Sequence, residues 1–170
     1  MDACQPWAHQ IELLQTIPGV GPKVAETIVA ETGADMTRFP TAGHLVSWAK
    51  FAPGVSESAG NPKGSGSTGH GNPYLARVLG EAAVAASKTD TFLGERYRRI
   101  ARRRGKKRAI VAVGRSILVI VWHLLADPTA RFHDLGADYH ASRIDRDRKT
   151  RNLVHQLQAL GHKVTLQPAA

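Results

Sequence analysis

The apolar stretch from Ala109 to Ala126, AIVAVGRSILVIVWHLLA, constrains the fold of this 170-residue chain more than any other feature. It is long enough to raise the question of a membrane span. However, Arg115 and His123 lie within it, and a charge at the centre of a bilayer is costly. We therefore expect a buried central helix in a helical domain, and no membrane partner.

Helical spacing recurs along the chain, whereas no alternation typical of a strand runs for long. Helix-start and helix-stop residues predict further helices at about 7–15, 22–31, 41–48, 73–87, 91–104 and 142–161. The predicted fold class is mainly α, a compact helical domain with an N-terminal helix-hairpin-helix, a long Gly/Ser loop and a C-terminal helix. Residues 1–127 would form the domain, and residues 128–170 a linker and an amphipathic helix. The end, HKVTLQP, fits either one short strand or an extended tail.

The stretch TIPGVGPKVAETIVAETG (Thr16–Gly33) resembles the turn and second helix of a helix-hairpin-helix motif. Gly19 and Gly21 permit a sharp turn, and Pro22 suits a helix start. Free N–H groups and the dipole at that start favour a phosphate, and Lys23 adds a positive charge beside them. Gly19, Gly21 and Lys23 are therefore candidate contacts to nucleic acid. The motif is typical of proteins that bind the DNA backbone without reading sequence. An ordinary helical hairpin in the core is the alternative.

The stretch ERYRRIARRRGKKR (Glu95–Arg108) has a net charge of +8, which nearly equals the net +9 of the whole chain. Such a local cluster favours a polyanion, with nucleic acid ahead of membrane, and binding that weakens as salt rises. Candidate contacts to nucleic acid within it are Arg98, Arg99, Arg102, Arg103, Lys106 and Lys107. The residues do not distinguish DNA from RNA, and a solvated charged face is the alternative.

The chain has one cysteine, Cys4, so it can form no internal disulfide and contains no CxxC zinc site. This composition fits the reducing cytoplasm. The eight histidines show no metal-ligand spacing, and we expect no metal bound by this chain.

The stretch SESAGNPKGSGSTGHGNPYL (Ser56–Leu75), which we call the serine segment, contains five Gly and four Ser. Its composition is that of a flexible linker. Small residues would also let a substrate approach a serine closely. The residues alone leave open whether the segment is a tether or a catalytic loop.

Four blocks of the sequence resemble one known family. They are TIPGVGPKVAETIVAETG, FPTAGHLVSWAKFAPGVSESAG, GHGNPYLARVLGEAAVAA and RYRRIARRRGKKRAIVAVGRSILVIVWHLL. In this order they look like the C-terminal transposase domain of the IS110 (IS116/IS110/IS902-type) insertion-sequence transposases, which are DEDD-plus-serine recombinases. The resemblance covers nearly the whole chain.

The resemblance implies an N-terminal RuvC-like domain, whose four acidic DEDD residues hold Mg²⁺, and a C-terminal domain that supplies a serine nucleophile. The matching residue is Ser58, with Ser56 as its nearest rival. Such enzymes cut and rejoin DNA, guided in studied members by a structured RNA, and they self-associate. A phosphoserine link to DNA would keep the bond energy that rejoining needs without ATP.

The chain departs from the family pattern at three places. After Ser-Ala-Gly the family usually has several Lys and Arg, whereas this chain has Lys63 alone. Where the family has Leu-Arg, this chain reads Leu75-Ala76-Arg77. Where the family has Gly-Leu, it reads Lys50-Phe51. Lys63 and Arg77 are further candidate contacts to nucleic acid.

We expect no room for a RuvC-like domain in 170 residues. The chain would then be a truncated transposase, inactive alone. The alternatives are a non-catalytic nucleic-acid-binding module, and an inhibitor or partner that acts with a RuvC-like domain supplied in trans.

Overall fold

A computed structural model describes residues 5–52, 56–58, 61–63 and 69–167. The chain divides into two compact units, Met1–Ala137 and Asp138–Ala170. The elements of the first unit are the 3-10 helices η1 (Gln5–Trp7) and η2 (Met36–Arg38), the strands β1 (Ser56–Ser58) and β2 (Asn61–Lys63), and the helices α1 (Ala8–Gln15), α2 (Pro22–Thr32), α3 (Ala42–Trp48), α4 (Pro73–Ala86), α5 (Phe92–Arg104) and α6 (Lys106–Ala126). The second unit contains α7 (Tyr139–Ser142) and α8 (Arg146–Ala159). The predicted mainly-α fold is confirmed.

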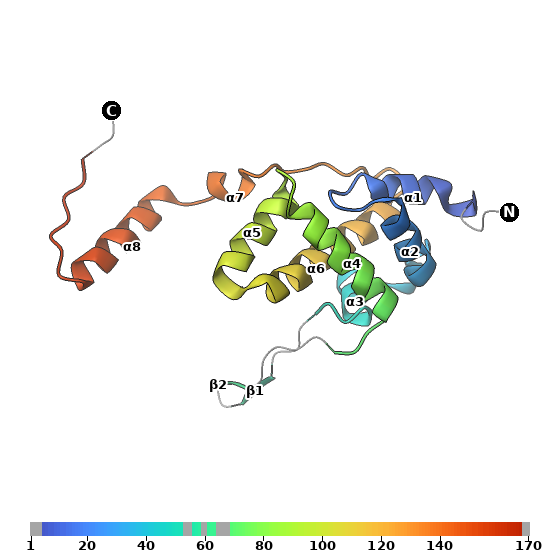
Figure 1. Ribbon diagram of the computed structural model, residues 1–170, viewed down its shortest axis with the longest axis horizontal. Coiled ribbons are helices and arrows are strands. Elements are labelled where there is room, and N and C mark those ends of the chain that lie inside the picture. The colour runs from blue at the N-terminus through green and yellow to red at the C-terminus, as the bar shows by residue number, and fades with distance from the viewer. Residues whose placement is uncertain (1–4, 53–55, 59–60, 64–68, 168–170) are drawn as a thin grey trace. The chain divides into compact units, whose positions relative to one another are not determined.

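The apolar stretch forms most of α6, which is the central helix of the first unit and contacts α3, α4 and α5 (Figure 1). By length and composition alone α6 could cross a membrane. Its buried face instead supplies much of the core, through Ala109, Val113, Gly114, Ile117, Leu118, Val121 and Leu124. Burying each large aliphatic side chain contributes about 1.5–3 kcal/mol, so this face is a main source of the unit's stability.

Helices begin and end at the residues that the sequence pattern indicates. Asn72 caps α4, because its Oδ1 accepts hydrogen bonds from the backbone N–H groups of Tyr74 and Leu75 at 2.9 and 3.1 Å. Thr91 caps α5 in the same way, with Oγ1 accepting from the N–H of Gly94 at 3.2 Å. Gly105, at φ 86°, separates α5 from α6 and lets the two helices fold back on each other.

The serine segment differs from the expected loop, since it contains a short antiparallel hairpin. In its register Ser56 faces Lys63, Glu57 faces Pro62, and Ser58 faces Asn61. Residues 162–167, by contrast, have no regular secondary structure, as the tail alternative requires. Strand structure thus lies in the serine segment rather than at the end of the chain.

The boundary between the units falls after Ala137, whereas the boundary predicted from the sequence lies between residues 127 and 128. Ala130 and Phe132 pack against the core, and the Asp134 carboxylate accepts a hydrogen bond from the N–H of Phe92 at 3.1 Å. These contacts join residues 128–137 to the first unit.

The second unit is built around α8, which is capped by Asp145 through the N–H of Arg148 at 2.9 Å. None of the residues of α8 is buried. The guanidinium of Arg143 lies over the ring of Tyr139, 4.9 Å from its centroid.

Candidate nucleic-acid interface

The N-terminal hairpin is formed by α1, a turn and α2, and its turn packs against α4. At Gly19, with φ 89°, an added Cβ would lie 2.3 Å from the carbonyl oxygen of Ala82 and 2.8 Å from the backbone nitrogen of Ala86. No side chain fits there. Gly19 is therefore a packing residue, which fixes the hairpin on α4.

Gly21 and Lys23 lie on the outer side of the same turn. Both are exposed, and a Cβ at Gly21 would meet nothing within 4 Å. Gly21 is the N-cap of α2 and provides no capping side chain, while the first backbone hydrogen bond runs from the N–H of Ala25 to the Gly21 carbonyl. The N–H groups of the first turn therefore remain available to an anion, next to the Lys23 ammonium.

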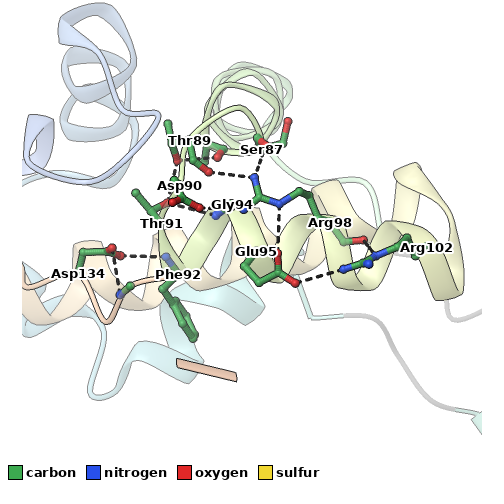
Figure 2. A network of polar contacts seen from close by, with 12 residues as sticks. Ser87, Thr89, Asp90, Thr91, Phe92, Gly94, Glu95, Arg98, Arg102 and Asp134 are labelled. Atoms are coloured by element: carbon green, nitrogen blue, oxygen red, sulfur yellow. Dashed lines mark hydrogen bonds and ion pairs between the residues drawn. The ribbon is translucent and has the colours of Figure 1, made fainter. Parts of the chain in front are cut away.

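Arg98, one of the predicted contacts, is held by its own chain (Figure 2). Its Nη1 donates to the carbonyl oxygens of Ser87 and Thr89, at 3.1 and 3.0 Å, and its Nε donates to the Glu95 carboxylate at 3.1 Å. Asp90 lies 3.7 Å away. Arg98 thus covers the C-terminal end of α4, where a cation is favourable, and ties it to α5.

Arg102 joins the same network. Its Nη2 donates to the other oxygen of Glu95 at 3.2 Å, although its side chain is largely exposed. Glu95 therefore bridges two arginines one turn apart, which stiffens the first half of α5 (Figure 2). Both predicted contacts therefore also make intramolecular bonds, while the Arg102 side chain stays largely exposed.

The other predicted cations of this region differ from Arg98 and Arg102. Arg103, Lys106 and Lys107 are exposed, and Arg99 is half-buried. Arg99 and Arg103, one turn apart on α5, line an open hollow of about 190 Å³ together with Ile100 and Arg104. Arg98 and Arg102 thus form one stripe along α5, and Arg99 and Arg103 form a second, which makes no ion pair among the described residues.

Sequence reasoning missed two arginines beside this second stripe, Arg96 on α5 and Arg115 on α6. Burial, and then the charges of Arg99 and Arg115, lower the pKa of the Arg96 guanidinium from its usual value. Arg115 interrupts the apolar stretch. A charge inside an otherwise apolar helix must lie on its outer face, and that signal could have identified it.

The base of the serine segment is anchored by the end of α3. The N–H of Phe51 donates to the Val46 carbonyl at 3.0 Å, and that of Lys50 donates to the Ser47 carbonyl at 3.1 Å. This is a Schellman motif, whose left-handed position is usually glycine. Here Lys50 occupies it at φ 60°, a conformation that glycine adopts more easily.

The far end of the serine segment returns to the same place. A Cβ at Gly71 would lie 2.7 Å from the carbonyl oxygen of Ala49, so the backbone at Gly71 lies directly against the backbone at Ala49. Next along the chain, the Asn72 amide donates a hydrogen bond to the carboxylate of Glu31 on α2. The Phe51 ring packs on α6 at Gly114, where a Cβ would lie 2.6 Å from its Cε1. Both ends of the segment are thereby fixed to the body.

Ser58 is the last residue of β1 and Ser56 the first, so Ser58 lies nearer the tip of the hairpin. Lys63 is the last residue of β2. The other serines of the segment, Ser65 and Ser67, lie outside the described residues. Arg77 is exposed on α4 and forms an ion pair with Glu81 at 3.0 Å.

No three His, Cys, Asp or Glu side chains of the described residues lie together in a way that could hold a metal ion. The two acids with altered pKa have local roles instead. The Thr37 hydroxyl and backbone N–H lower the pKa of Asp35, and those of Thr129 do the same for Asp127. The described residues therefore do not form a site for the Mg²⁺ that the family resemblance implies.

Comparison with known proteins relates these features to one family. Residues 11–98, just over half of the chain, match the Transposase IS116/IS110/IS902 family. The chain is also 33% identical, over 125 residues, to the uncharacterized 43.6 kDa protein of insertion element IS110 from Streptomyces coelicolor. That match covers 72% of this chain but only 30% of the relative. The matched stretch contains the hairpin, the serine segment and the start of α5, and the chain belongs to the IS116/IS110/IS902 transposase family.

Proposed function

We propose that this chain is the serine-bearing, nucleic-acid-binding part of an insertion-sequence transposase. The observation that carries the proposal is the family match, which includes both the hairpin with an exposed helix start and the anchored segment with Ser58. DNA is the proposed substrate, and the cytoplasm the proposed location.

Binding would use the two cationic surfaces that are not occupied by internal contacts. One is the start of α2 with Lys23, and the other is the stripe of half-buried Arg99 and exposed Arg103 on α5, together with Lys107 at the start of α6. Because these groups would contact phosphates, affinity should not depend strongly on base sequence and should fall with salt.

The proposed chemistry begins with attack of the Ser58 hydroxyl oxygen on a phosphodiester. A bond forms between this oxygen and phosphorus, and the bond from phosphorus to one sugar oxygen breaks. The serine proton passes to a base, and the departing sugar oxygen takes up a proton. Attack by another sugar hydroxyl on the phosphoserine would reverse these steps and rejoin DNA.

Mg²⁺ would supply stabilisation of charge on the phosphate when it is bound. Since the described residues do not fit it, we propose that its carboxylates come from a RuvC-like domain outside these 170 residues, on the same or another polypeptide. A structured guide RNA and self-association are further proposed features, supported by the family resemblance alone.

Covalent trapping tests the serine proposal. The chain is incubated with Mg²⁺, the RuvC-like part of a relative, and labelled DNA and transcribed RNA from the ends of the insertion element, and adducts are separated under denaturing conditions. We expect a protein–DNA adduct that Ser58→Ala abolishes and Ser56→Ala retains.

An adduct that persists in Ser58→Ala would contradict the assignment of the nucleophile. If the wild-type chain binds DNA but forms no adduct under any of these conditions, the chain is a non-catalytic binding module. A wild-type chain that does not bind nucleic acid at low salt would overturn the proposed function as a whole.

A further inference from the structure

Three arginines meet where α5 folds back along α6. Arg96 and Arg99 come from successive turns of α5, and Arg115 comes from α6. Arg96 and Arg99 lie one turn apart on α5, and α5 packs along α6, which carries Arg115. Burial, and then the charges of Arg99 and Arg115, lower the pKa of Arg96. Like charges repel, so this arrangement needs an anion to be favourable.

The structure provides no protein anion for these three residues. The Nε atoms of Arg96 and Arg99 are buried and have no hydrogen-bond partner among the described residues. Over the same residues, no ion pair involves Arg96, Arg99 or Arg115. A buried donor without a partner is unfavourable, which points to a ligand that supplies acceptors.

The neighbouring face of α5 makes the contrast clear. There Arg98 and Arg102 share the carboxylate of Glu95, and Arg98 also reaches Asp90 (Figure 2). The acids near α5 are therefore engaged on one face only. Arg96 and Arg99 lie beside this face of α5, and no carboxylate of the described residues pairs with them.

We propose that Arg96, Arg99 and Arg115 form a binding site for a phosphate group of a nucleic-acid backbone. The inference rests on the proposed function and identifies the part of the basic region that performs it. Guanidinium groups donate paired hydrogen bonds that match phosphate oxygens, and three cations suit a polyanion better than a single carboxylate.

The surroundings of the three arginines favour a polymer over a free ion. Arg103 continues the same stripe one turn farther along α5 and shares a hollow with Arg99. Beyond it come the exposed cations of the turn and the start of α6, which are Arg104, Lys106, Lys107 and Arg108. A backbone seated at the site could therefore meet further positive charges along its course.

The test measures binding of the full chain to duplex DNA and to stem-loop RNA of equal length over a range of KCl concentrations. We expect Arg96→Gln, Arg99→Gln and Arg115→Gln each to weaken binding several-fold and to lower the slope of log affinity against log salt by about one. Arg99→Lys should keep the slope of log affinity against log salt but lower the affinity, since lysine keeps the positive charge without the paired N–H donors of the guanidinium. Arg38→Gln, an exposed control outside this region, should leave both quantities unchanged.

Inorganic phosphate serves as a second probe that does not depend on nucleic acid. It should raise the unfolding temperature of the wild-type chain more than that of the triple variant Arg96→Gln/Arg99→Gln/Arg115→Gln, with folding of both checked by circular dichroism. The measurements with RNA and with DNA identify which backbone binds more tightly. A loss of affinity in the variants for either nucleic acid supports the site.

The two proposals fail differently. If the wild-type chain binds nucleic acid and all three glutamine variants retain its affinity and salt slope, the arginine site is wrong while the proposed function stands. If the wild-type chain binds neither DNA nor RNA, the proposed function fails and the site fails with it.

Discussion

Among the turns whose backbone has a positive φ, two that hold the candidate site together are occupied by different residues. The turn between α1 and α2 has Gly19 at φ 89°, and the turn after α3 has Lys50 at φ 60°. At Gly19 the backbone of α4 excludes any side chain, whereas the Lys50 side chain is exposed. The difference teaches that packing, rather than backbone conformation alone, decides where glycine cannot be replaced.

The largest expected effect is that of Gly19→Ala. The new methyl group would collide with the backbone of α4, and the residue would also adopt an unfavourable φ, so we expect a loss of about 3 kcal/mol or more in the free energy of unfolding. Urea unfolding followed by circular dichroism measures it. A loss below about 1 kcal/mol would show that α4 can move away from the hairpin.

Asn72→Ala should have the next largest effect, because Asn72 caps α4 and also binds Glu31. Loss of the cap costs about 1 kcal/mol, and the unpaired Glu31 carboxylate adds to that, so we expect about 1–2 kcal/mol in total. Asn72→Ser keeps a capping oxygen and should recover part of the loss. Equal destabilisation by both substitutions would mean that the contact with Glu31, rather than the cap, is the dominant contribution.

Lys50→Gly should act in the opposite direction and stabilise the protein. A non-glycine residue in the left-handed region costs about 1 kcal/mol, and part of the gain is offset because glycine is more flexible when unfolded. We expect a net increase of about 0.5 kcal/mol in the free energy of unfolding. Lys50→Ala, which removes the charge without relieving the backbone, is the matched control, and an increase of the same size in that variant would contradict the explanation.

Gly21→Ala should have the smallest effect, although Gly21 lies only two residues from Gly19. Its φ of −88° suits any residue and the space around it is open. The entropic gain of alanine roughly offsets its weaker N-capping, so we expect a change within about 0.5 kcal/mol in chemical unfolding. A loss comparable to that of Gly19→Ala would remove the distinction between the two glycines.

The helices could be predicted from sequence because their signals are local. The N-cap Asn72 and the break at Gly105 lie within a few residues of the ends they determine, and the apolar period of α6 marks its buried face. The partners of Gly19 could not be predicted in this way, since Ala82 and Ala86 lie more than sixty residues farther along the chain.

The roles of the arginines could be predicted only in part. Helical spacing separates Arg98 and Arg102 from Arg99 and Arg103, but it does not say which pair has partners within the chain. That depends on the carbonyl oxygens at the end of α4, and on the fold of α5 against α6, which brings Arg115 to Arg96. The hairpin within the serine segment was also missed, because a sequence so rich in glycine and serine has no strand pattern.

Because the two ends of the serine segment are held close together, the residues between them can be replaced or changed in number. Its two ends are held at one place on the body by Ala49 and Gly71, and by the bond from Asn72 to Glu31. The entropy of closing a loop grows slowly with length, by about 0.6 kcal/mol for each doubling. Insertions and deletions between the ends should therefore leave the helical body intact, so that the length and charge of this segment can change without changes to the domain that carries it.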